Sequence, residues 1–238
     1  MANKHSSIKQ IAVGLSLVSV CAVAIPSGGA RAAESSKPAA APQPNPVPVK
    51  ADSGDLFETI SEESRLTAQD REVLGWAREL SAECGQVLEK WISSGAVSED
   101  RLFARLYYPQ PNTDPTKYTT DYDALADRDI GPIQERYLTK TEMLSYVIVT
   151  DLNAYVPTHN QRYAQPLTGN LAVDLVNNRT KRIFMTTVGF RAARNEASVL
   201  VQSYERDNGE RVLDLSVPLS VRGKHFGSVR FGYRPIQK

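Results

Sequence analysis

The sequence predicts an α+β fold in which a five-stranded antiparallel sheet carries a long N-terminal helix packed on one face. Three patterns lead to this prediction. Apolar residues recur at helical spacing from 73 to 92, an apolar β-branched run occupies 145–150, and three alternating segments lie between 199 and 233. Their order places the helix before the sheet and leaves a long excursion between the strands.

The long helix is predicted from its cap onward. Thr67 suits an N-cap, Asp70 favours the positive helix end, and 93–95 (Ser-Ser-Gly) should end the helix. An apolar stripe follows one face at spacings of 4, 3, 4, 3 and 4: Val73, Ala77, Leu80, Cys84, Val87 and Trp91. This stripe is expected to pack on the sheet, with Cys84 as a buried structural thiol; the alternative is a dimer seam between two such helices.

The last forty residues carry the clearest strand signal. They predict a three-stranded meander with strands at 199–206, 211–221 and 226–233 and turns at 207–210 and 222–225. In the middle strand, the odd positions from Leu213 to Val221 are apolar and the even positions are mostly polar. One sheet face can therefore receive the long helix, and the mixed opposite face suits a pocket wall.

The remaining elements are shorter. The run at 145–150 predicts a strand, and 151–160 should turn and join it to a second strand of the same sheet. Short helices are expected at 55–64, 98–106, 121–126, 132–138 and 171–178, and 189–197 is expected to be irregular.

The N-terminus has the pattern of a secretory signal peptide. Lys4 and Lys9 precede an apolar run at 11–25, and Ala30-Arg31-Ala32 fits a cleavage site. We therefore expect a signal peptide at 1–32, a disordered Ala/Pro-rich linker at 33–54 and a folded domain at 55–238. The alternative is an uncleaved anchor, for which the run is shorter than the roughly 20 residues of a membrane span. Export with cleavage after Ala32 predicts a periplasmic protein.

Charge and cysteine content narrow the function. The whole chain has 28 basic and 27 acidic residues, and cleavage would remove three basic ones (Lys4, Lys9 and Arg31), leaving 25 against 27, a net charge of −2. This balance does not favour nucleic acid as a partner. Cys84 would be the sole remaining cysteine, so no internal disulfide is expected.

Several blocks of the sequence resemble a known family. The segments at 102–118, 151–160, 177–184, 201–210, 214–227 and 229–233 are similar to the PAS-like or Cache-like sensory domain of methyl-accepting chemotaxis proteins, over roughly 68–235. The resemblance implies small-molecule sensing, with the signal passed through a coiled coil to a kinase-controlling module that this chain lacks. The chain departs from the family pattern at Ala154 (usually Gly), near Met185 (an acid) and at Phe226 (usually Trp).

The candidate ligand-binding residues cluster in these blocks. Arginines could grip a carboxylate in bidentate fashion, and Tyr155, Gln202 and Tyr204 could orient it. Alternatively, the arginines could pair with aspartates to hold loops. The predicted set is Asp151, Asn153, Tyr155, His159, Asn160, Arg179, Arg182, Gln202, Tyr204, Arg206 and Arg230.

The sequence offers no metal, cofactor or catalytic signature. His159 and His225, the histidines of the mature chain, lack further ligands at metal spacing, and no haem attachment sequence occurs. Nucleophile-elbow, phosphate-loop and zinc-protease motifs are also missing. We therefore expect a protein without a cofactor that is not an enzyme; a hydrolase centred on His159 is the weakest hypothesis.

Two functional hypotheses remain. The first is a periplasmic domain that binds a small polar metabolite, with a carboxylate-bearing one as an option, in chemotaxis-type signal transduction, alone or through a membrane receptor or sensor kinase. The alternative is a ligand-free structural or protein-interaction module of the same fold, with a homodimer through the long helix as one form.

Overall fold

The computed structural model describes residues 58–205 and 211–236. The expected signal peptide, the linker, the turn at 207–210 and the candidate residue Arg206 lie outside the described residues. All described residues belong to one compact unit. Within them, no helix combines the length and the apolar character needed to cross a membrane.

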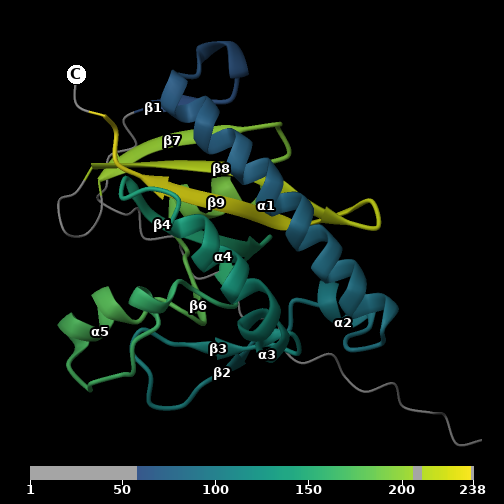
Figure 1. The fold of residues 1–238 in the computed structure, drawn as a ribbon. Helices are drawn as coiled ribbons and strands as arrows, with labels where there is room; N and C mark the ends of the chain where they lie inside the picture. Colours follow the sequence, from purple (N-terminus) through teal and green to yellow (C-terminus); the bar gives the residue numbers. More distant parts are fainter. Residues whose placement is uncertain (1–57, 206–210, 237–238) are drawn as a thin grey trace, which may run out of the picture. The chain divides into compact units, whose positions relative to one another are not determined.

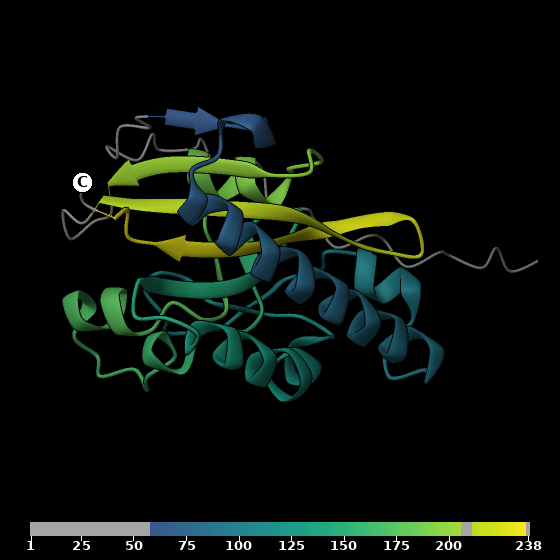
Figure 2. The ribbon, with the colours of Figure 1, turned by 45° about the horizontal axis from the view of Figure 1, so that its top comes forward.

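A five-stranded antiparallel sheet forms the centre of this unit, which confirms the predicted α+β class (Figure 1). β1 and β4 form its edges, with β7 next to β1 (Figure 2). In spatial order the strands are β1 (Glu58–Ile60), β7 (Leu200–Glu205), β8 (Arg211–Val221), β9 (Lys224–Tyr233) and β4 (Leu144–Asp151).

The predicted membership of this sheet was wrong at one strand. Within the segment predicted as a short helix at 55–64, the structure describes residues from 58 onward: Glu58–Ile60 form β1, which pairs with β7, and a 3-10 turn (Glu63–Arg65) begins at Glu63. An exposed strand edge offers unpaired backbone groups, and a three-residue segment with β-branched Thr59 and Ile60 satisfies them.

The segment that follows β4 leaves the main sheet instead of adding a strand to it. β5 (Tyr155–Val156) pairs with β6 (Arg182–Ile183) in a separate two-stranded sheet. Ala154 has a positive φ of 58°, a turn conformation that redirects the chain directly after β4. Pro157 has no N–H, so it cannot extend the pairing of β5.

α1 (Ala68–Ser93) lies against β8 and β9. Thr67 is its N-cap: the Thr67 hydroxyl accepts from the Asp70 N–H at 3.1 Å, and the Asp70 carboxylate accepts from the Thr67 N–H at 2.9 Å. The stripe residues Val73, Ala77, Leu80, Cys84 and Trp91 are buried, with at most 1% exposure. Because the sheet covers this stripe, a second helix could reach it only by displacing the sheet.

The other elements surround the sheet. α4 packs beside α1 on β4, and α6 packs on β7, β8 and β9. A further two-stranded sheet pairs β2 with β3. The bounds are α2 (Glu99–Phe103), β2 (Tyr108–Pro109), β3 (Tyr118–Thr119), α3 (Asp123–Leu125), a π-helical turn (Ala126–Ile130), α4 (Gly131–Leu138), a 3-10 turn (Gln161–Tyr163), α5 (Leu171–Asn177) and α6 (Thr187–Ala193).

The segment expected to be irregular at 189–197 begins inside α6. Thr186 caps this helix by accepting from the Gly189 N–H at 2.9 Å. Gly189 weakens the helical pattern in the sequence, yet the packing requires it. A Cβ atom there would lie 2.4 Å from the Phe184 carbonyl oxygen.

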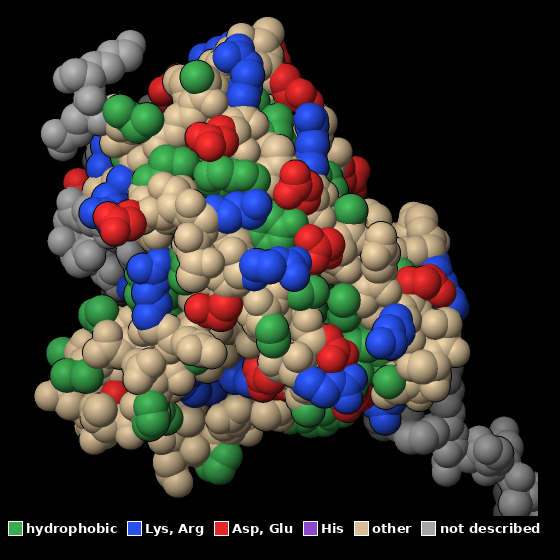
Figure 3. Space-filling view, viewed as in Figure 1, with side chains coloured by type: hydrophobic (Ala, Val, Ile, Leu, Met, Phe, Trp, Pro, Cys, Tyr) green, Lys and Arg blue, Asp and Glu red, His purple; other side chains and the backbone are tan. Residues whose placement is uncertain are grey.

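α5 has the reverse of the usual burial pattern. Its acid, Asp174, is buried and accepts from the Thr168 hydroxyl and N–H, both at 2.8 Å. Its aliphatic residues Leu171, Val173 and Val176 are exposed, and Figure 3 shows apolar side chains on the surface over this region. The helix is therefore held by the hydrogen bonds of Asp174 more than by apolar packing.

Candidate functional site

Polar side chains are buried together on the sheet face opposite α1. Alternation along the strands sends the apolar residues of β8 toward α1 and their neighbours toward the other face. α6 packs against three of these strands. We call this group the polar layer: Tyr146 and Thr150 from β4, Gln202 from β7, Asp214 and Ser216 from β8, and Ser228 and Arg230 from β9.

An ion pair forms the centre of the polar layer. Arg230 donates to Asp214 Oδ2 from Nη2 at 2.6 Å and from Nε at 3.0 Å, and both residues are almost fully buried. The Tyr146 hydroxyl also donates to Asp214 and lies 3.2 Å from the Tyr204 hydroxyl. Arg230 is therefore paired with an aspartate of the chain itself, which is the alternative proposed for the arginines. Here the pair joins two strands, β8 and β9, and not a loop.

Gln202 is only partly satisfied. Its Nε2 donates to the Val188 carbonyl of α6 at 3.1 Å, while Oε1 is buried without a hydrogen-bond partner. Leaving a buried acceptor unmet costs about 1–3 kcal/mol. An acceptor that stays unmet at this cost among hydrogen-bonded neighbours needs a functional explanation.

Aromatic residues form a wall beside the polar layer. The His159 ring lies 5.0 Å from that of Tyr163 and 6.3 Å from that of Tyr146, measured between ring centroids. Phe184 and Tyr204 pack against the same cluster. His159 Nδ1 accepts from the Asn160 N–H at 2.8 Å. We call Tyr146, His159, Tyr163, Phe184 and Tyr204 the aromatic wall.

Asp151 and its neighbours instead brace a loop. Asp151 Oδ1 accepts from the N–H groups of Asn153 and Tyr155 at 2.9 and 3.0 Å. Its Oδ2 accepts from the hydroxyls of Tyr107 and Tyr122 at 2.5 and 3.2 Å. Burial raises the pKa of Asp151, although all four hydrogen bonds oppose the shift. These contacts occupy the carboxylate completely and favour a structural role.

Two other predicted ligand residues also hold the fold. The Tyr155 hydroxyl donates to Asp123 Oδ1 at 2.9 Å. Asn160 Oδ1 accepts from the Val147 N–H at 2.8 Å, and its Nδ2 donates to Glu135 at 2.9 Å. Asn160 thereby ties the start of the excursion to β4 and α4.

The arginines of the excursion lie near the aromatic wall. The Arg182 guanidinium stands 5.0 Å from the centroid of the Phe184 ring. The Arg179 N–H donates to the Tyr163 carbonyl at 2.6 Å. The structure therefore groups His159, Gln202, Tyr204 and Arg230, places Arg182 beside them through Phe184, and separates Asp151, Asn153, Tyr155 and Asn160.

Sequence reasoning missed Lys117. This lysine is buried, and its Nζ donates to Asn178 Oδ1 and to the Thr180 carbonyl, which links the loop before β3 to the segment before β6. Burial lowers the pKa of Lys117 from 10.5 to about 8. No local pattern indicates such a residue, because its acceptors lie about sixty residues away in the chain.

Metal-binding geometry is not found among residues 58–205 and 211–236, where no three His, Cys, Asp or Glu side chains come together as ligands. His225 contacts its own hairpin, with Nε2 2.6 Å from the Gly227 carbonyl oxygen.

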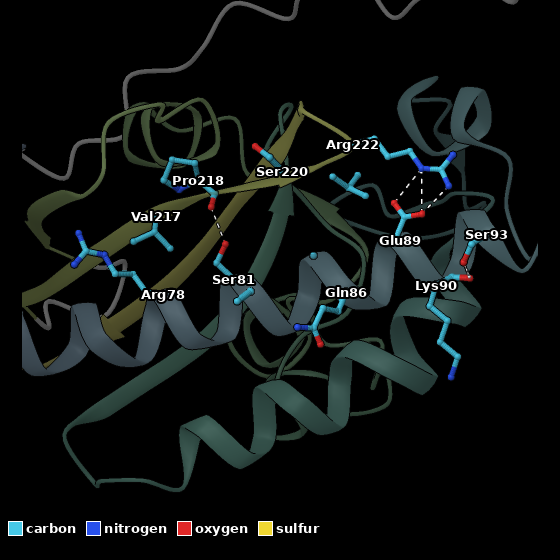
Figure 4. Close-up of a pocket in the computed structure, with 13 residues that line it drawn as sticks. Arg78, Ser81, Gln86, Glu89, Lys90, Ser93, Val217, Pro218, Ser220 and Arg222 are labelled. Carbon is cyan, nitrogen blue, oxygen red and sulfur yellow. Dashed lines mark hydrogen bonds and ion pairs between the residues drawn. The ribbon is translucent and has the colours of Figure 1, made fainter.

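A separate groove of about 800 Å³ lies between α1 and β8 (Figure 4). Ser81 on one wall donates to the Pro218 carbonyl at 2.7 Å, and Arg222 on the other pairs with Glu89 at 2.6 Å. None of the predicted ligand residues lines this groove. Because Arg222 and Glu89 pair with each other and none of the predicted ligand residues is present, we regard it as a surface groove and not as the ligand site.

Comparisons with known proteins add no assignment: no family model, curated protein or solved structure matches the chain.

Proposed function

We propose that this protein is an exported sensory domain of the PAS-like or Cache-like kind, which binds a small polar molecule at the polar layer under α6. The observation that carries the proposal is the polar layer itself, with an ion pair and an unmet acceptor inside the domain. Burying polar groups destabilises a fold unless they are satisfied. A group that stays unmet suits a binding surface better than a structural core.

The resemblance supports the same location. Five of the similar sequence blocks each contribute at least one residue to the polar layer or the aromatic wall, among them His159, Phe184, Gln202, Asp214 and Arg230. These blocks lie far apart in the sequence and meet on one sheet face. An apolar wall with a few convergent polar groups is the usual composition of a small-molecule site.

The signal of ligand binding would be transmitted from the polar layer to α1 through the sheet. β8 and β9 carry Asp214 and Arg230 on one face and contact α1 on the other. A ligand that shifts these strands would therefore also displace α1, which packs on them. In this proposal, the domain reports to a membrane receptor or sensor kinase of chemotaxis-type signal transduction, in the periplasm.

A thermal-shift screen tests the proposal. The mature chain (33–238) is melted with organic acids, amino acids, amines and purines, and at least one compound should raise the midpoint in a concentration-dependent manner. Tyr204→Phe, in the aromatic wall, should weaken the response. Gln86→Ala, in the α1–β8 groove, is the matched control and should leave it unchanged. A flat response across all four classes would count against ligand binding.

A protein-interaction module is the second candidate, and the α1–β8 groove is the observation that favours it. Its test is mass by light scattering for the wild type and for Gln86→Arg. A dimer that the variant disrupts would support this candidate. Substituting Leu80 would not test it, because Leu80 is fully buried under the sheet and its loss would disturb the fold.

The proposal assigns no catalysis to His159. Its Nδ1 is engaged by the Asn160 N–H, and its ring packs against Tyr163. Turnover of any substrate that His159→Ala abolished, with an unchanged circular dichroism spectrum, would contradict this assignment.

A further inference from the structure

The polar layer is electrically balanced before any ligand arrives. Its one basic side chain, Arg230, bonds its one acid, Asp214, and the Tyr146 hydroxyl gives that acid a further hydrogen bond. A carboxylate placed here would add an uncompensated negative charge next to Asp214, which is costly in a buried setting. The layer therefore disfavours the carboxylate ligand that the arginine content of the sequence predicted.

The unmet atom in the layer is an acceptor. Nitrogen and oxygen of a side-chain amide are distinguished by their partners, and the neighbour of the Gln202 amide is the Val188 carbonyl. A carbonyl can only accept, so Nε2 must face it and Oε1 must be the free atom. Reversing the amide would place two acceptors against each other.

Nearby donors do not reach Oε1. Asp214, the residue paired with Gln202 across the sheet, is itself an acceptor and already takes hydrogen bonds from Arg230 and Tyr146. The hydroxyls of Thr150 and Ser228 pair with each other at 3.1 Å. Gln202 Oε1 therefore stays unmet within the layer.

Resting on the proposed function, we propose that the ligand of this site presents an N–H donor, as an ammonium or a carboxamide, to Gln202 Oε1. Such a group would satisfy the acceptor and would add no negative charge beside Asp214. The aromatic wall would cover the apolar part of the ligand, because His159, Tyr163 and Phe184 pack against this side of the layer.

Three probes of equal chain length test the chemistry: propylammonium, propionamide and propionate. Each is titrated into the mature chain at constant ionic strength and followed by amide chemical shifts. We expect saturable binding of propylammonium and propionamide, with shifts at Val188 and Gln202, and no saturation with propionate. The ammonium and amide arms then separate a charged ligand from a neutral one.

Variants of Gln202 locate the donor contact. Gln202→Met keeps the side-chain length and removes the acceptor, so both nitrogen probes should lose about tenfold or more in affinity. Gln202→Glu should favour propylammonium over propionamide. Circular dichroism and the melting midpoint of each variant show whether it is folded. If Gln202→Met binds both probes as the wild type does, the inference is wrong.

The outcomes also separate this inference from the proposed function. Binding of propionate alone, or of a larger screened compound in a manner independent of Gln202, would overturn the inference and leave a sensory site in place. If none of the probes or screened compounds binds, then Gln202 Oε1 is a buried acceptor that meets at most internal water, and both proposals fall.

Discussion

Among single residues, Arg230 and Asp214 show most clearly how burial sets the role of a side chain. From the sequence alone, the candidate arginines cannot be distinguished as ligand-binding residues. In the fold, Arg230 is buried against Asp214 while Arg182 lies beside a partly exposed aromatic ring. Only tertiary structure distinguishes them, because Arg230 and Asp214 are sixteen positions apart on neighbouring strands.

Removing one partner of this pair should be strongly destabilising. We expect Arg230→Met to lower the free energy of unfolding by about 3–5 kcal/mol, because Asp214 would be left as an unpaired buried charge. The double variant Arg230→Met, Asp214→Asn removes both charges and keeps an acceptor for Tyr146, so it should recover more than half of the loss. Urea unfolding measures all three proteins. A single variant within about 1 kcal/mol of the wild type would refute a buried, functional pair.

Lys117 should make stability depend on pH. Its folded pKa of about 8 lies below its ordinary value of 10.5, so between these values the unfolded chain binds more protons than the folded one. The contribution of Lys117 to stability therefore rises with pH across this window. Burial raises the pKa of Cys84 to about 12, which has the opposite effect above pH 9.

The Lys117 effect is isolated by difference. The free energy of unfolding of the wild type and of Lys117→Met is measured from pH 7 to pH 10, so that Cys84 contributes equally to both proteins. The wild type should gain stability relative to the variant as the pH passes 8. Parallel curves would mean that Lys117 keeps its ordinary pKa.

At the scale of elements, the capping box of α1 links the helix to the sheet. Thr67→Ala should cost about 1 kcal/mol, the usual value for a lost N-cap. Asp70→Ala should cost more, because the Asp70 carboxylate also accepts from the Tyr233 hydroxyl of β9 at 2.5 Å. Chemical denaturation of both variants tests the order, and equal losses would show that the Tyr233 contact contributes nothing.

Two glycines provide a matched pair of substitutions. A Cβ atom at Gly227 would lie 2.0 Å from the Thr150 carbonyl oxygen, so Gly227→Ala should force β4 and β9 apart and prevent stable folding. Gly75 in α1 has nothing within 4 Å of such an atom, and Gly75→Ala should stabilise by up to about 1 kcal/mol. Melting midpoints of both variants test these expectations. A folded Gly227→Ala variant with the wild-type midpoint would refute the register between β4 and β9.

Elements governed by local residues were predictable, and those governed by distant partners were not. The cap at Thr67 and the alternation in β8 can be read from neighbouring positions. β1 could not be predicted, because three residues become a strand only when the edge of β7 is available. α6 was missed because Gly189 is selected by contact with Phe184 and not by helix propensity.

For the whole molecule, the sequence indicated a mixed polar and apolar sheet face but not which polar residues meet on it. Polar residues at alternate positions correctly suggested a mixed face opposite α1. The stretch at 151–160, the densest polar segment, was expected to touch the ligand, yet Asp151 and Asn160 are occupied as braces. Tyr146 stands within an apolar run of the sequence, and its place in the polar layer follows only from its hydrogen bond to Asp214.

Small molecules are proposed to bind at the polar layer under α6. The most direct test is an amide chemical-shift map of the mature chain after addition of the pooled acids, amino acids, amines and purines. We expect shifts at Val188, Gln202 and Asp214, with the groove residues Ser81 and Gln86 unchanged. Shifts confined to Ser81, Gln86 and the rest of the α1–β8 groove would contradict it.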